Sequence, residues 1–496
     1  MISLGIDIGG TGCKCVAFSD KGEQLALSYR EYSVPAGTVN LPTRILSDSV
    51  LEVIRRCVAQ LNDPEAVAVL TFSSFGESFV AIDEAGEPLE DIRMYFGNSE
   101  SEDFDRLVET VGEKTFMDIC RILPDASYSL SKMLATLKTV SRPVYKFLLI
   151  SGYICYLLTG KAATDMALAS RTMLFDPQAQ KWSEKLLEAA GICIEQLPEV
   201  VPYGTSLGSI LPDMADALGL SRTTQIVMGA HDQIVNALGA GVSQVGDAVD
   251  TSGTTECITP MFARIPEGEA FQKENYTSIP YLQERGYVTY AYNISAGSVV
   301  RWYRDALGQS LKHEAAAEGK SIYDLLNESA PVAPTSLMVL PFLQGMGGTP
   351  DVDPNATGLI AGLTTQTRLP DLYRAVLEGI TFEMRYNQEK LREKGIAFER
   401  LFACGGGAKS PVWLQIKADI LGCEVVPVQS EETGAMGCAI LGLSAVTGED
   451  PFDIAKSFRR YGDPFKPIEE NLRLYAQRYE VYKQLRSFWT TNEFTC

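Results

Sequence analysis

Asp232 stands at the junction between an apolar segment and a segment of small residues. Residues 225–228 read Gln-Ile-Val-Met, and residues 236–241 are mostly alanine and glycine. This pattern predicts a buried strand that ends, and a helix that begins, at Asp232. Catalytic carboxylates are often mounted at such strand ends, over a cleft. A carboxyl group with an ordinary pKa of about 4 is ionised at neutral pH and can accept a proton from an attacking hydroxyl group. We therefore expect Asp232 to act as a general base.

Two turns rich in glycine and threonine have the composition of phosphate-binding loops. The first, at residues 7–12, lies between predicted strands at 2–8 and 14–18, and the second, at 252–255, also connects two predicted strands. Backbone amides in such a bend can surround a phosphate group. A carboxylate beside it indicates Mg²⁺ held through water, which makes Asp7 the metal candidate. A plain hairpin is the alternative for the first turn. Since the same layout opens both halves of the chain, it favours a duplicated architecture that holds one nucleotide between the halves.

Two further loops carry residues suited to a ligand. Residues 404–411 contain three consecutive glycines between a predicted strand at 400–403 and a predicted helix at 412–421. Their backbone could therefore approach a flat ligand closely. Glu77 follows a predicted strand at 66–72, where a carboxylate could bind the hydroxyl groups of a sugar or polyol. A solvated loop acid is the alternative for Glu77.

The composition is that of a soluble globular protein and argues against several classes of function. A chain of 496 residues exceeds what one hydrophobic core usually supports, so we expect two large domains. The formal charge of −20 offers no basic surface to nucleic acids or acidic lipids. With two histidines, a zinc site or a histidine-based triad is hard to build, and 11 scattered cysteines favour reduced core thiols in the cytoplasm. The longest apolar run, residues 147–158, is too short to span a bilayer and predicts a buried helix.

The ordered series of motifs resembles the FGGY carbohydrate kinases, which belong to the superfamily of actin-like, sugar-kinase and chaperone ATPases. The resemblance runs nearly end to end, and it implies an α/β fold of two ribonuclease-H-like (actin-like ATPase) domains. Each domain would be a mixed sheet flanked by helices, with an interdomain cleft. An N-terminal domain at 1–243 would bind the sugar and carry the first phosphate motif, and a C-terminal domain at 244–496 would carry the second phosphate motif and the adenosine motif. The motifs that carry the resemblance lie at residues 7–14, 229–233, 253–255, 358–378 and 405–411.

The resemblance also implies a role for each site residue. Asp232 would be the base, with Gln233, His231 and Glu77 as acceptor contacts. The remaining candidates would bind ATP, with Mg²⁺ at Asp7. Facing the transferred phosphate are Gly9, Thr11 and Lys14; facing the ADP portion are Gly253, Thr254, Gly297 and the weaker candidate Arg301; facing the adenosine are Gly406, Gly407 and Ser410.

The resemblance predicts an ATP-dependent kinase and leaves its acceptor open. Xylulokinases often carry Gln-Met-His-Gly where this chain has residues 75–78, and the Arg-Glu of glycerol kinases is matched only at Glu77, without the arginine. Residues 95–100 also depart from the usual pattern. We expect a ketopentose such as xylulose as the acceptor, with a glycerol- or erythritol-type polyol second. A hydrolase-type ATPase, a hexokinase-type or ROK sugar kinase and a non-catalytic sugar sensor are further alternatives. No nucleic-acid or membrane partner is expected, and a homodimer is one option for the assembly.

Overall fold

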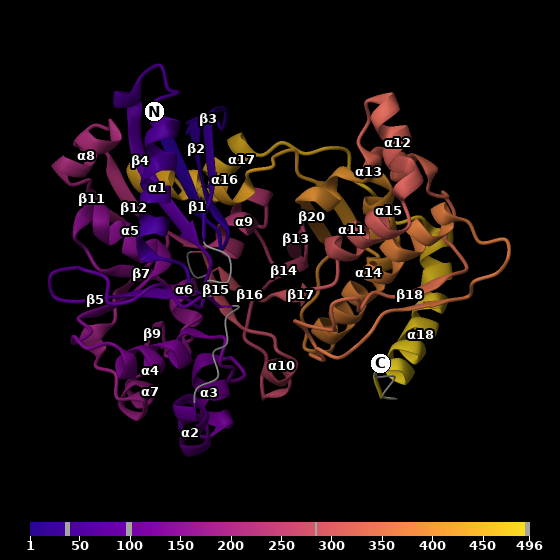
Figure 1. Ribbon diagram of the computed structural model, residues 1–496, viewed down its shortest axis with the longest axis horizontal. Helices are drawn as coiled ribbons and strands as arrows, with labels where there is room; N and C mark the ends of the chain where they lie inside the picture. The colour runs from indigo at the N-terminus through magenta and orange to yellow at the C-terminus, as the bar shows by residue number, and fades with distance from the viewer. Residues whose placement is uncertain (35–39, 96–101, 283–284, 492–496) are drawn as a thin grey trace. The chain divides into compact units, whose positions relative to one another are not determined.

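The computed structural model describes residues 1–34, 40–95, 102–282 and 285–491, which fold into two compact units (Figure 1). The first unit comprises residues 1–243, 277–287 and 432–459, and the second comprises the remainder, residues 244–276, 288–431 and 460–496. Each unit contains a β-sheet with helices packed against it, which confirms the α/β class. The units are discontinuous, whereas the sequence prediction was two continuous domains. Segments 277–287 and 432–459 fold with the N-terminal part of the chain.

The sheet of the first unit brings three parallel strands to one edge. Strands β1, β4 and β12 run parallel, with β1 paired to β4 and β4 to β12, so their carboxyl ends lie together. Their apolar sequences suit strands that are covered on both faces, and the strands predicted at 2–8, 14–18, 66–72 and 225–228 are confirmed. In spatial order the sheet is β11 (Ser206–Ser209), β12 (Gln225–His231), β4 (Val67–Ser74), β1 (Ile2–Ile8), β2 (Gly12–Ser19) and β3 (Gln24–Glu31).

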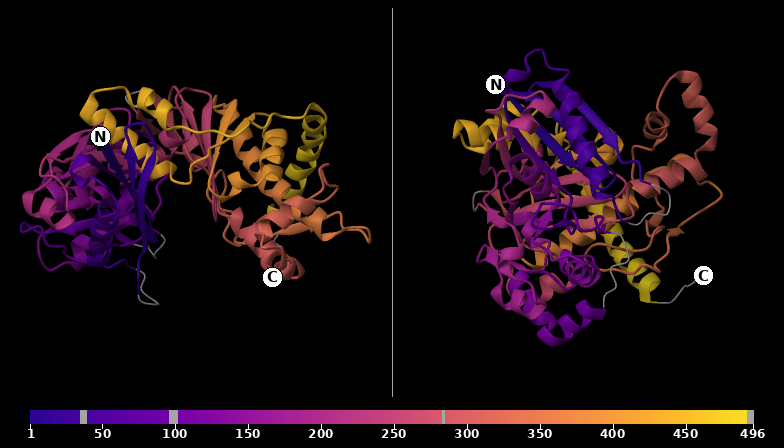
Figure 2. Two further views of the ribbon diagram at one scale, coloured as in Figure 1. Left: turned by 90° about the horizontal axis from the view of Figure 1, so that it is seen from above. Right: turned by 60° about the vertical axis from the view of Figure 1, so that its left-hand side comes forward.

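A helix from the C-terminal part of the chain packs on this sheet. Helix α16 (Thr433–Thr447), golden in Figures 1 and 2, contacts β1, β4 and helix α9 (Asp232–Ala240). A Cβ atom at Gly437 would overlap the carbonyl oxygen of Val235, so glycine permits this close approach. The other helices in the layers around this sheet are α1 (Thr43–Val58), α5 (Ile150–Thr159), α8 (Pro212–Leu218) and α17 (Pro451–Phe458).

The rest of the first unit is built from short elements. Residues 147–149 belong to strand β6, paired with β5, and the helix begins only at Ile150, so the helix predicted over 147–158 is wrong for its first three residues. Pairing with β5 overrides the local apolar pattern there. These elements are η1 (Pro64–Ala66), β5 (Phe79–Ile82), α2 (Glu102–Val111), α3 (Glu113–Cys120), α4 (Ser129–Thr139), β6 (Lys146–Leu149), β7 (Ala163–Asp165), α6 (Met166–Ser170), β8 (Phe175–Asp176), β9 (Lys181–Trp182), α7 (Glu184–Ala190), η2 (Ile194–Gln196), β10 (Glu199–Val201) and β15 (Ile279–Tyr281).

The second unit repeats the hairpin that opens the first. Strands β13 and β14 are antiparallel, as β1 and β2 are, and β20 runs parallel to β13. The carboxyl ends of β13 and β20 therefore share an edge. The strands are β13 (Asp247–Ser252), β14 (Glu256–Phe262), β17 (Ala291–Asn293), β20 (Arg400–Cys404) and β21 (Glu424–Pro427), with β16 (Gly286–Val288) at the change between units and the separate pair β18 (Met338–Leu340) and β19 (Leu359–Ala361).

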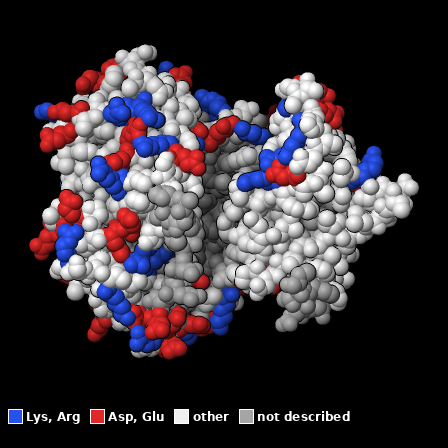
Figure 3. Space-filling model, viewed as in Figure 1, with Lys and Arg blue, Asp and Glu red and all other residues white. Residues whose placement is uncertain are grey.

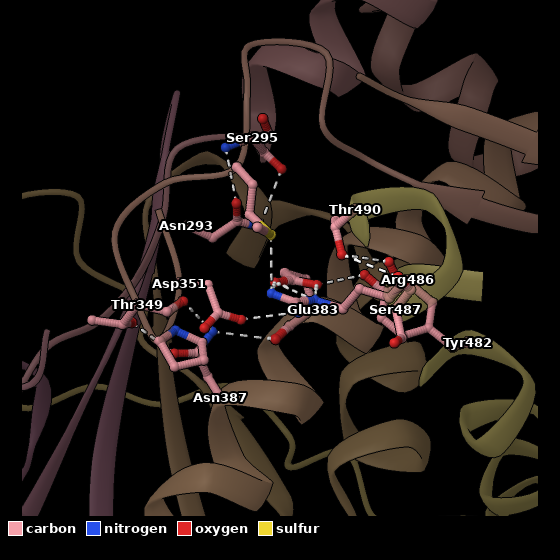
Figure 4. A network of polar contacts seen from close by, with 12 residues as sticks. Asn293, Ser295, Thr349, Asp351, Glu383, Asn387, Tyr482, Arg486, Ser487 and Thr490 are labelled. Carbon is pink, nitrogen blue, oxygen red and sulfur yellow. Dashed lines mark hydrogen bonds and ion pairs between the residues drawn. The ribbon is translucent and has the colours of Figure 1, made fainter. Parts of the chain in front are cut away.

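A buried polar network fixes the last helix of the second unit (Figure 4). Arg486 of α18 pairs with Glu383 of α14 at 3.0 Å and with Asp351 at 3.0 Å, and Tyr482 donates to Glu383 at 2.6 Å. The C-terminal helix is therefore part of this unit's core. The helices of the unit are α10 (Ala270–Lys273), α11 (Gly297–Ala306), α12 (Gln309–Glu318), α13 (Ile322–Ser329), α14 (Leu369–Glu393), η4 (Gly406–Lys409), α15 (Pro411–Leu421) and α18 (Glu469–Thr491).

The surface and the thiols agree with the composition. Basic and acidic side chains are interspersed over the visible face of the first unit (Figure 3). The ten cysteines in the described ranges are free thiols, and all but Cys193 are buried. Among the described residues, no helix combines the length and the apolar character needed to cross a membrane.

Candidate active site

The edge where β1, β4 and β12 end carries several of the polar residues that the sequence predicted for the site. Asp7 lies opposite Ser73 in the β1–β4 register, and the Ser73 hydroxyl group donates to Asp7 Oδ1 at 2.8 Å. His231 lies opposite Ser74 in the β4–β12 register. The parallel order of these strands therefore brings the carboxylate predicted for the metal and the segment predicted for the base to the same edge.

Asp232 is the first residue of α9, and its Oδ1 atom faces a nitrogen lone pair. His231 Nδ1 accepts a hydrogen bond from the Gln233 amide at 3.3 Å, so this nitrogen carries no proton. Burial lowers the pKa of His231 to about 4, which keeps the imidazole neutral. Nδ1 lies 3.1 Å from Asp232 Oδ1 and offers it no hydrogen. Within the described ranges, Oδ1 has no hydrogen-bond donor, and it is therefore available to accept a proton.

Burial and a neighbouring carboxylate raise the pKa of two carboxyl groups at this edge. Burial, followed by the charge of Glu77, raises the pKa of Asp232 to about 7. Burial, followed by the charge of Asp232, raises the pKa of Asp7 to about 6. The Asp232 side chain keeps 36% of its surface exposed, so a ligand can reach it. Perturbed carboxyl groups that remain accessible are typical of catalytic sites.

Glu77 approaches the base from the loop after β4. Its φ of 61° is unusual for a residue other than glycine, and its carboxylate forms an ion pair with Arg171. The Arg171 guanidinium lies 4.8 Å from the centre of the Tyr128 ring. Arg171 is not among the predicted site residues, because residues 169–172 taken alone could be caps and turns. Of the atypical segment 95–100, Tyr95 packs on Phe75 at 5.8 Å between ring centres, and residues 96–100 lie outside the described residues.

The first hairpin turn offers a possible ligand backbone groups and one lysine, which is ion-paired. The Gly9 amide donates to the Gly12 carbonyl oxygen at 2.9 Å, and Thr11 is exposed. Lys14, predicted to face a phosphate group, forms an ion pair of 2.6 Å with Glu432, just before α16. This lysine thus has an acidic partner within the fold.

The second hairpin turn is joined to the start of α11. A Cβ atom at Gly297 would overlap the Gly253 carbonyl oxygen, and the Ser298 amide donates to the Thr254 carbonyl oxygen at 2.9 Å. Arg301, one turn along the helix, donates to the Thr254 hydroxyl group at 2.9 Å. The structure therefore brings together all four residues predicted for the ADP portion of ATP.

Side chains before α11 hold this arrangement in place. The side-chain oxygen of Asn293 accepts a hydrogen bond from the Ser295 amide at 3.0 Å, and the Ser295 hydroxyl group donates to the Gly345 carbonyl oxygen at 3.1 Å. Asn293 and Ser295 are drawn in Figure 4. The turn that leads into Gly297 is thus fixed from within the unit.

The glycine triplet lies against the end of β13. A Cβ atom at Gly405 would lie 2.7 Å from the Ser252 carbonyl oxygen, and one at Gly407 would lie 2.5 Å from Ser252 Cβ. Gly406 has room, with its nearest neighbour 3.9 Å away. Ser410 begins α15: its hydroxyl group accepts from the Trp413 amide at 3.2 Å and donates to Asn327 at 2.7 Å. Its side chain is therefore already engaged within the fold.

A buried lysine that the sequence did not reveal lies beneath these loops. Lys417 of α15 forms ion pairs with Asp250 of β13 and, at 2.9 Å, with Glu256 of β14, and donates to the Ser252 hydroxyl group at 2.5 Å. Burial opposes its charge, but the charges of Asp250 and Glu256 outweigh burial and raise the pKa of Lys417. Lys417 thus ties α15 to both strands of the hairpin.

Comparison with known proteins identifies the family. Residues 2–239 match the N-terminal domain, and residues 249–446 the C-terminal domain, of the FGGY family of carbohydrate kinases. Xylulose kinase of Bacillus subtilis (strain 168) is 25% identical over 491 residues, which span 97% of this chain and 96% of that protein. Gluconokinase of Bacillus licheniformis is 28% identical over 507 residues, which span 99% of this chain and 96% of that protein.

A solved structure shares the fold. The ligand-bound xylulose kinase from Lactobacillus acidophilus matches with a TM-score of 0.86 at 22% identity, over 98% of both chains. Together with the two domain matches, this likeness confirms the two-domain, actin-like ATPase fold that the motifs implied. The chain belongs to the FGGY family of carbohydrate kinases.

Proposed function

We propose that this kinase transfers the γ-phosphoryl group of ATP to a hydroxyl group of a ketopentose such as xylulose, with Asp232 as the general base. A polyol of the glycerol or erythritol type is the second candidate. The observation that carries the proposal is Asp232 Oδ1, which lies at a strand end beside His231 Nδ1 and accepts no hydrogen bond from the described residues. Such an oxygen can take the proton of an acceptor hydroxyl group.

The proposed reaction is a direct displacement. The acceptor oxygen attacks the γ-phosphorus, its proton passes to Asp232 Oδ1, and the bond from the γ-phosphorus to the bridging oxygen breaks to release ADP. Because the transition state of phosphoryl transfer is loose, the protein mainly positions the reactants and stabilises charge. The protonated carboxyl group can then donate to His231 Nδ1, which lies 3.1 Å away. His231 would thereby stabilise the base after it has taken the proton.

The nucleotide would be held chiefly by backbone. Gly253, Thr254 and Gly297 form the closely joined turn that we assign to the ADP portion, with Arg301 at its margin. Gly406 and Gly407 would lie against the adenosine, where a side chain would obstruct a flat ligand. Ser410 would contribute through its backbone, since its hydroxyl group caps α15.

Lys14 and the first turn would face the transferred phosphate. Gly9 and Thr11 would donate backbone amides, and Lys14 would exchange Glu432 for a phosphate oxygen. The exchange is feasible because the lysine side chain remains 29% exposed. An ammonium group with a replaceable acidic partner suits a site that binds and releases an anion.

Asp7 is the residue we assign to Mg²⁺. The described residues contain no group of three or more histidine, cysteine or acidic side chains that could hold a metal ion. Mg²⁺ typically keeps several waters and takes one or two carboxylates plus substrate phosphates, so one carboxylate fits this ion. When bound, it would supply positive charge that offsets the phosphate oxygens. Asp7, whose pKa is raised to about 6, would hold the ion in its deprotonated form.

The proposal is tested by ADP release over a panel of acceptors. Purified enzyme with Mg²⁺ and ATP is assayed with ketopentoses, aldoses, polyols and aldonates, and without any acceptor. We expect ADP release that depends on the acceptor and is fastest with a ketopentose or a polyol. Equal ATP turnover without acceptor would indicate a hydrolase, and acceptor binding by calorimetry without turnover would indicate a sugar sensor; either result would overturn the proposal.

A further inference from the structure

The relatives' names do not decide whether the acceptor is a neutral sugar or a sugar acid, and the residues around Glu77 bear on this question. One is named a xylulose kinase and another a gluconokinase, at 25% and 28% identity, so similarity does not choose between a neutral sugar and a sugar acid. The charged groups around Glu77 would interact differently with these two classes of acceptor. A carboxylate on the acceptor would need an uncompensated positive charge, whereas a diol needs a donor and an acceptor side by side.

We propose that Arg171 and Glu77 form a neutral ion-pair subsite that binds two adjacent hydroxyl groups of the acceptor and selects neutral sugars and polyols over aldonates. This inference rests on the proposed function and adds Arg171 as a specificity-determining residue. Glycerol kinases carry an arginine directly before this glutamate, and the present chain does not. Arg171, at the end of α6, would supply the guanidinium group instead.

The geometry leaves part of the pair open. Nε and Nη2 of Arg171 both contact Oε1 of Glu77. Within the described ranges, Oε2 of Glu77 takes part in neither of these contacts and in no other hydrogen bond or ion pair. The side chains of Arg171 and Glu77 retain 16% and 12% of their exposed surface. One acceptor hydroxyl group can therefore donate to Glu77 Oε2 while the next accepts from the guanidinium.

The pair is held rigidly against the base. Asp165 caps α6 by accepting from the Ala167 and Leu168 amides at 2.9 and 3.0 Å, which fixes the helix that ends at Arg171. A Cβ atom at Gly76 would lie 3.1 Å from both Arg171 and His231, so the loop before Glu77 lies between the arginine and the base segment. An acceptor bound to the pair would therefore lie beside Asp232.

The charges around the pair disfavour an anionic acceptor. Glu77 already compensates Arg171, and Asp232 lies close enough for its pKa to respond to both charges. Among the described residues, Lys132 is a further cation near Glu77, but it is 3% exposed and its ammonium group donates to the carbonyl oxygens of Ser127 and Tyr128. An aldonate carboxylate would meet Glu77 and Asp232 without a free cation to balance it, and like charges at close range exclude such ligands.

The test compares neutral acceptors with their matched acids. Glycerol is paired with glycerate, xylitol with xylonate and glucitol with gluconate, and ketopentoses complete the neutral class. For the wild-type enzyme we expect kcat/KM for the best neutral acceptor to exceed that for the best acid at least about 100-fold. Glu77→Gln keeps the size and removes the charge, so it should reduce this ratio at least about tenfold.

Variants of Arg171 separate a role in acceptor binding from a role in folding. Arg171→Gln should raise the acceptor KM at least about tenfold while the KM for ATP stays within about twofold. Arg171→Lys restores the charge without the planar donor pair and should recover only part of the loss. Arg142→Gln is the matched control, because it breaks the exposed pair with Asp83 in the same unit and should change neither KM. Thermal melting checks that each variant is folded.

The outcomes distinguish this inference from the proposed function. If folded Arg171→Gln keeps the wild-type acceptor KM, the subsite is wrong and the proposed function stands. If the wild-type enzyme releases ADP faster with the acids, the neutral acceptor of the proposed function is wrong as well, and only acceptor-dependent phosphoryl transfer remains. If no acceptor of either class stimulates ADP release, the proposed function fails and the inference fails with it. Should Arg171→Gln fail to fold, the Glu77→Gln ratio decides alone.

Discussion

The two units build their candidate sites from different materials. In the first unit, burial and a neighbouring carboxylate raise the pKa of two groups: Asp232 acts on Asp7, and Glu77 acts on Asp232. In the second unit, the exposed turn at Gly253 is joined to Gly297 by close backbone approach, and the charged groups lie buried beneath it. The first site should therefore be sensitive to substitutions that change a charge while keeping the size of the side chain. The second should be sensitive to added atoms, and to loss of the buried ions that support it.

Removing the buried cation of the second unit should have the largest effect. Lys417→Met roughly keeps the length of the side chain but leaves Asp250, 0% exposed, without its cationic partner. Breaking a buried pair on one side typically costs about 3 to 5 kcal/mol of stability. We expect a loss of this size in urea unfolding, accompanied by a higher KM for ATP, because Lys417 also binds the Ser252 hydroxyl group.

An exposed lysine from the glycine-rich loop provides the control for that variant. Lys409 pairs with Glu431 at the surface, where the side chains keep 67% and 72% of their exposure. Surface pairs contribute little, so Lys409→Met should leave the unfolding midpoint unchanged. Equal midpoints for Lys417→Met and the wild-type enzyme would show that the buried ions do not support the hairpin.

Neutralising the base should break the first site without changing its shape. Asp232→Asn is nearly isosteric, and loss of a general base lowers rates by about two to four orders of magnitude. We expect kcat to fall at least about 100-fold while ATP affinity, measured by calorimetry, stays unchanged. Asp216→Asn removes an exposed carboxylate of the same unit and should keep wild-type kcat. Acceptor-dependent ADP release at the wild-type rate by Asp232→Asn would exclude Asp232 as the base.

Adding one carbon should damage the second site. In Gly297→Ala, the new methyl group overlaps the Gly253 carbonyl oxygen, and relief of such overpacking costs about 1 to 3 kcal/mol. We expect the KM for ATP to rise about tenfold, with the acceptor KM little changed. Ser298→Ala, one residue further, removes an oxygen atom without adding bulk and should behave as the wild-type enzyme. An unchanged KM for ATP in Gly297→Ala would remove this turn from the nucleotide site.

The pH profile should reveal the charges of the first site. Asp232 acts as a base only when deprotonated, and its pKa is raised to about 7, so kcat/KM should fall about tenfold per pH unit below pH 7. Glu77 raises this pKa and Arg171 lowers it. Glu77→Gln should therefore move the acidic limb to lower pH, and Arg171→Gln to higher pH. Asp7 should steepen the fall below pH 6, whereas His231 titrates only near pH 4. Shifts in the same direction for both variants would contradict this arrangement.

Local pattern was sufficient to predict the elements that carry the backbone of both sites. Apolar runs that end at loops or small-residue segments predicted β1, β4, β12 and β20, because strand formation and turn chemistry are local properties. The parallel order of the strands, which the structure supplies, then places Asp7, Glu77 and Asp232 at one edge. The strand ends that carry the candidate residues could therefore be predicted from the sequence.

Contacts between distant segments could not be predicted in this way. Arg171 meets Glu77 across 94 positions, and Lys417 meets Asp250 across 167. Each cation lies in or just after a helix whose local sequence is ordinary, and only tertiary packing turns it toward a carboxylate. The same holds for α16, which lies near the C-terminus in sequence and packs on β1 in space. Pairing of this kind is decided by the fold and leaves no periodic signal.

Changing Arg301, at the exposed margin of the second site, should give the smallest effect. It also separates the contribution of charge to ATP binding from that of shape within that unit. Arg301 is exposed and donates to the Thr254 hydroxyl group at 2.9 Å, so a contact with a phosphate group there would be screened by water and salt. Arg301→Gln should raise the KM for ATP only about two- to fivefold. In about 0.5 M salt the difference from the wild-type enzyme should vanish, because screening then acts within a few ångströms. The defect of Gly297→Ala, which is steric, should persist at that salt concentration. If salt abolished both defects, the turn would bind ATP mainly by charge, and the contrast between the two units would be wrong.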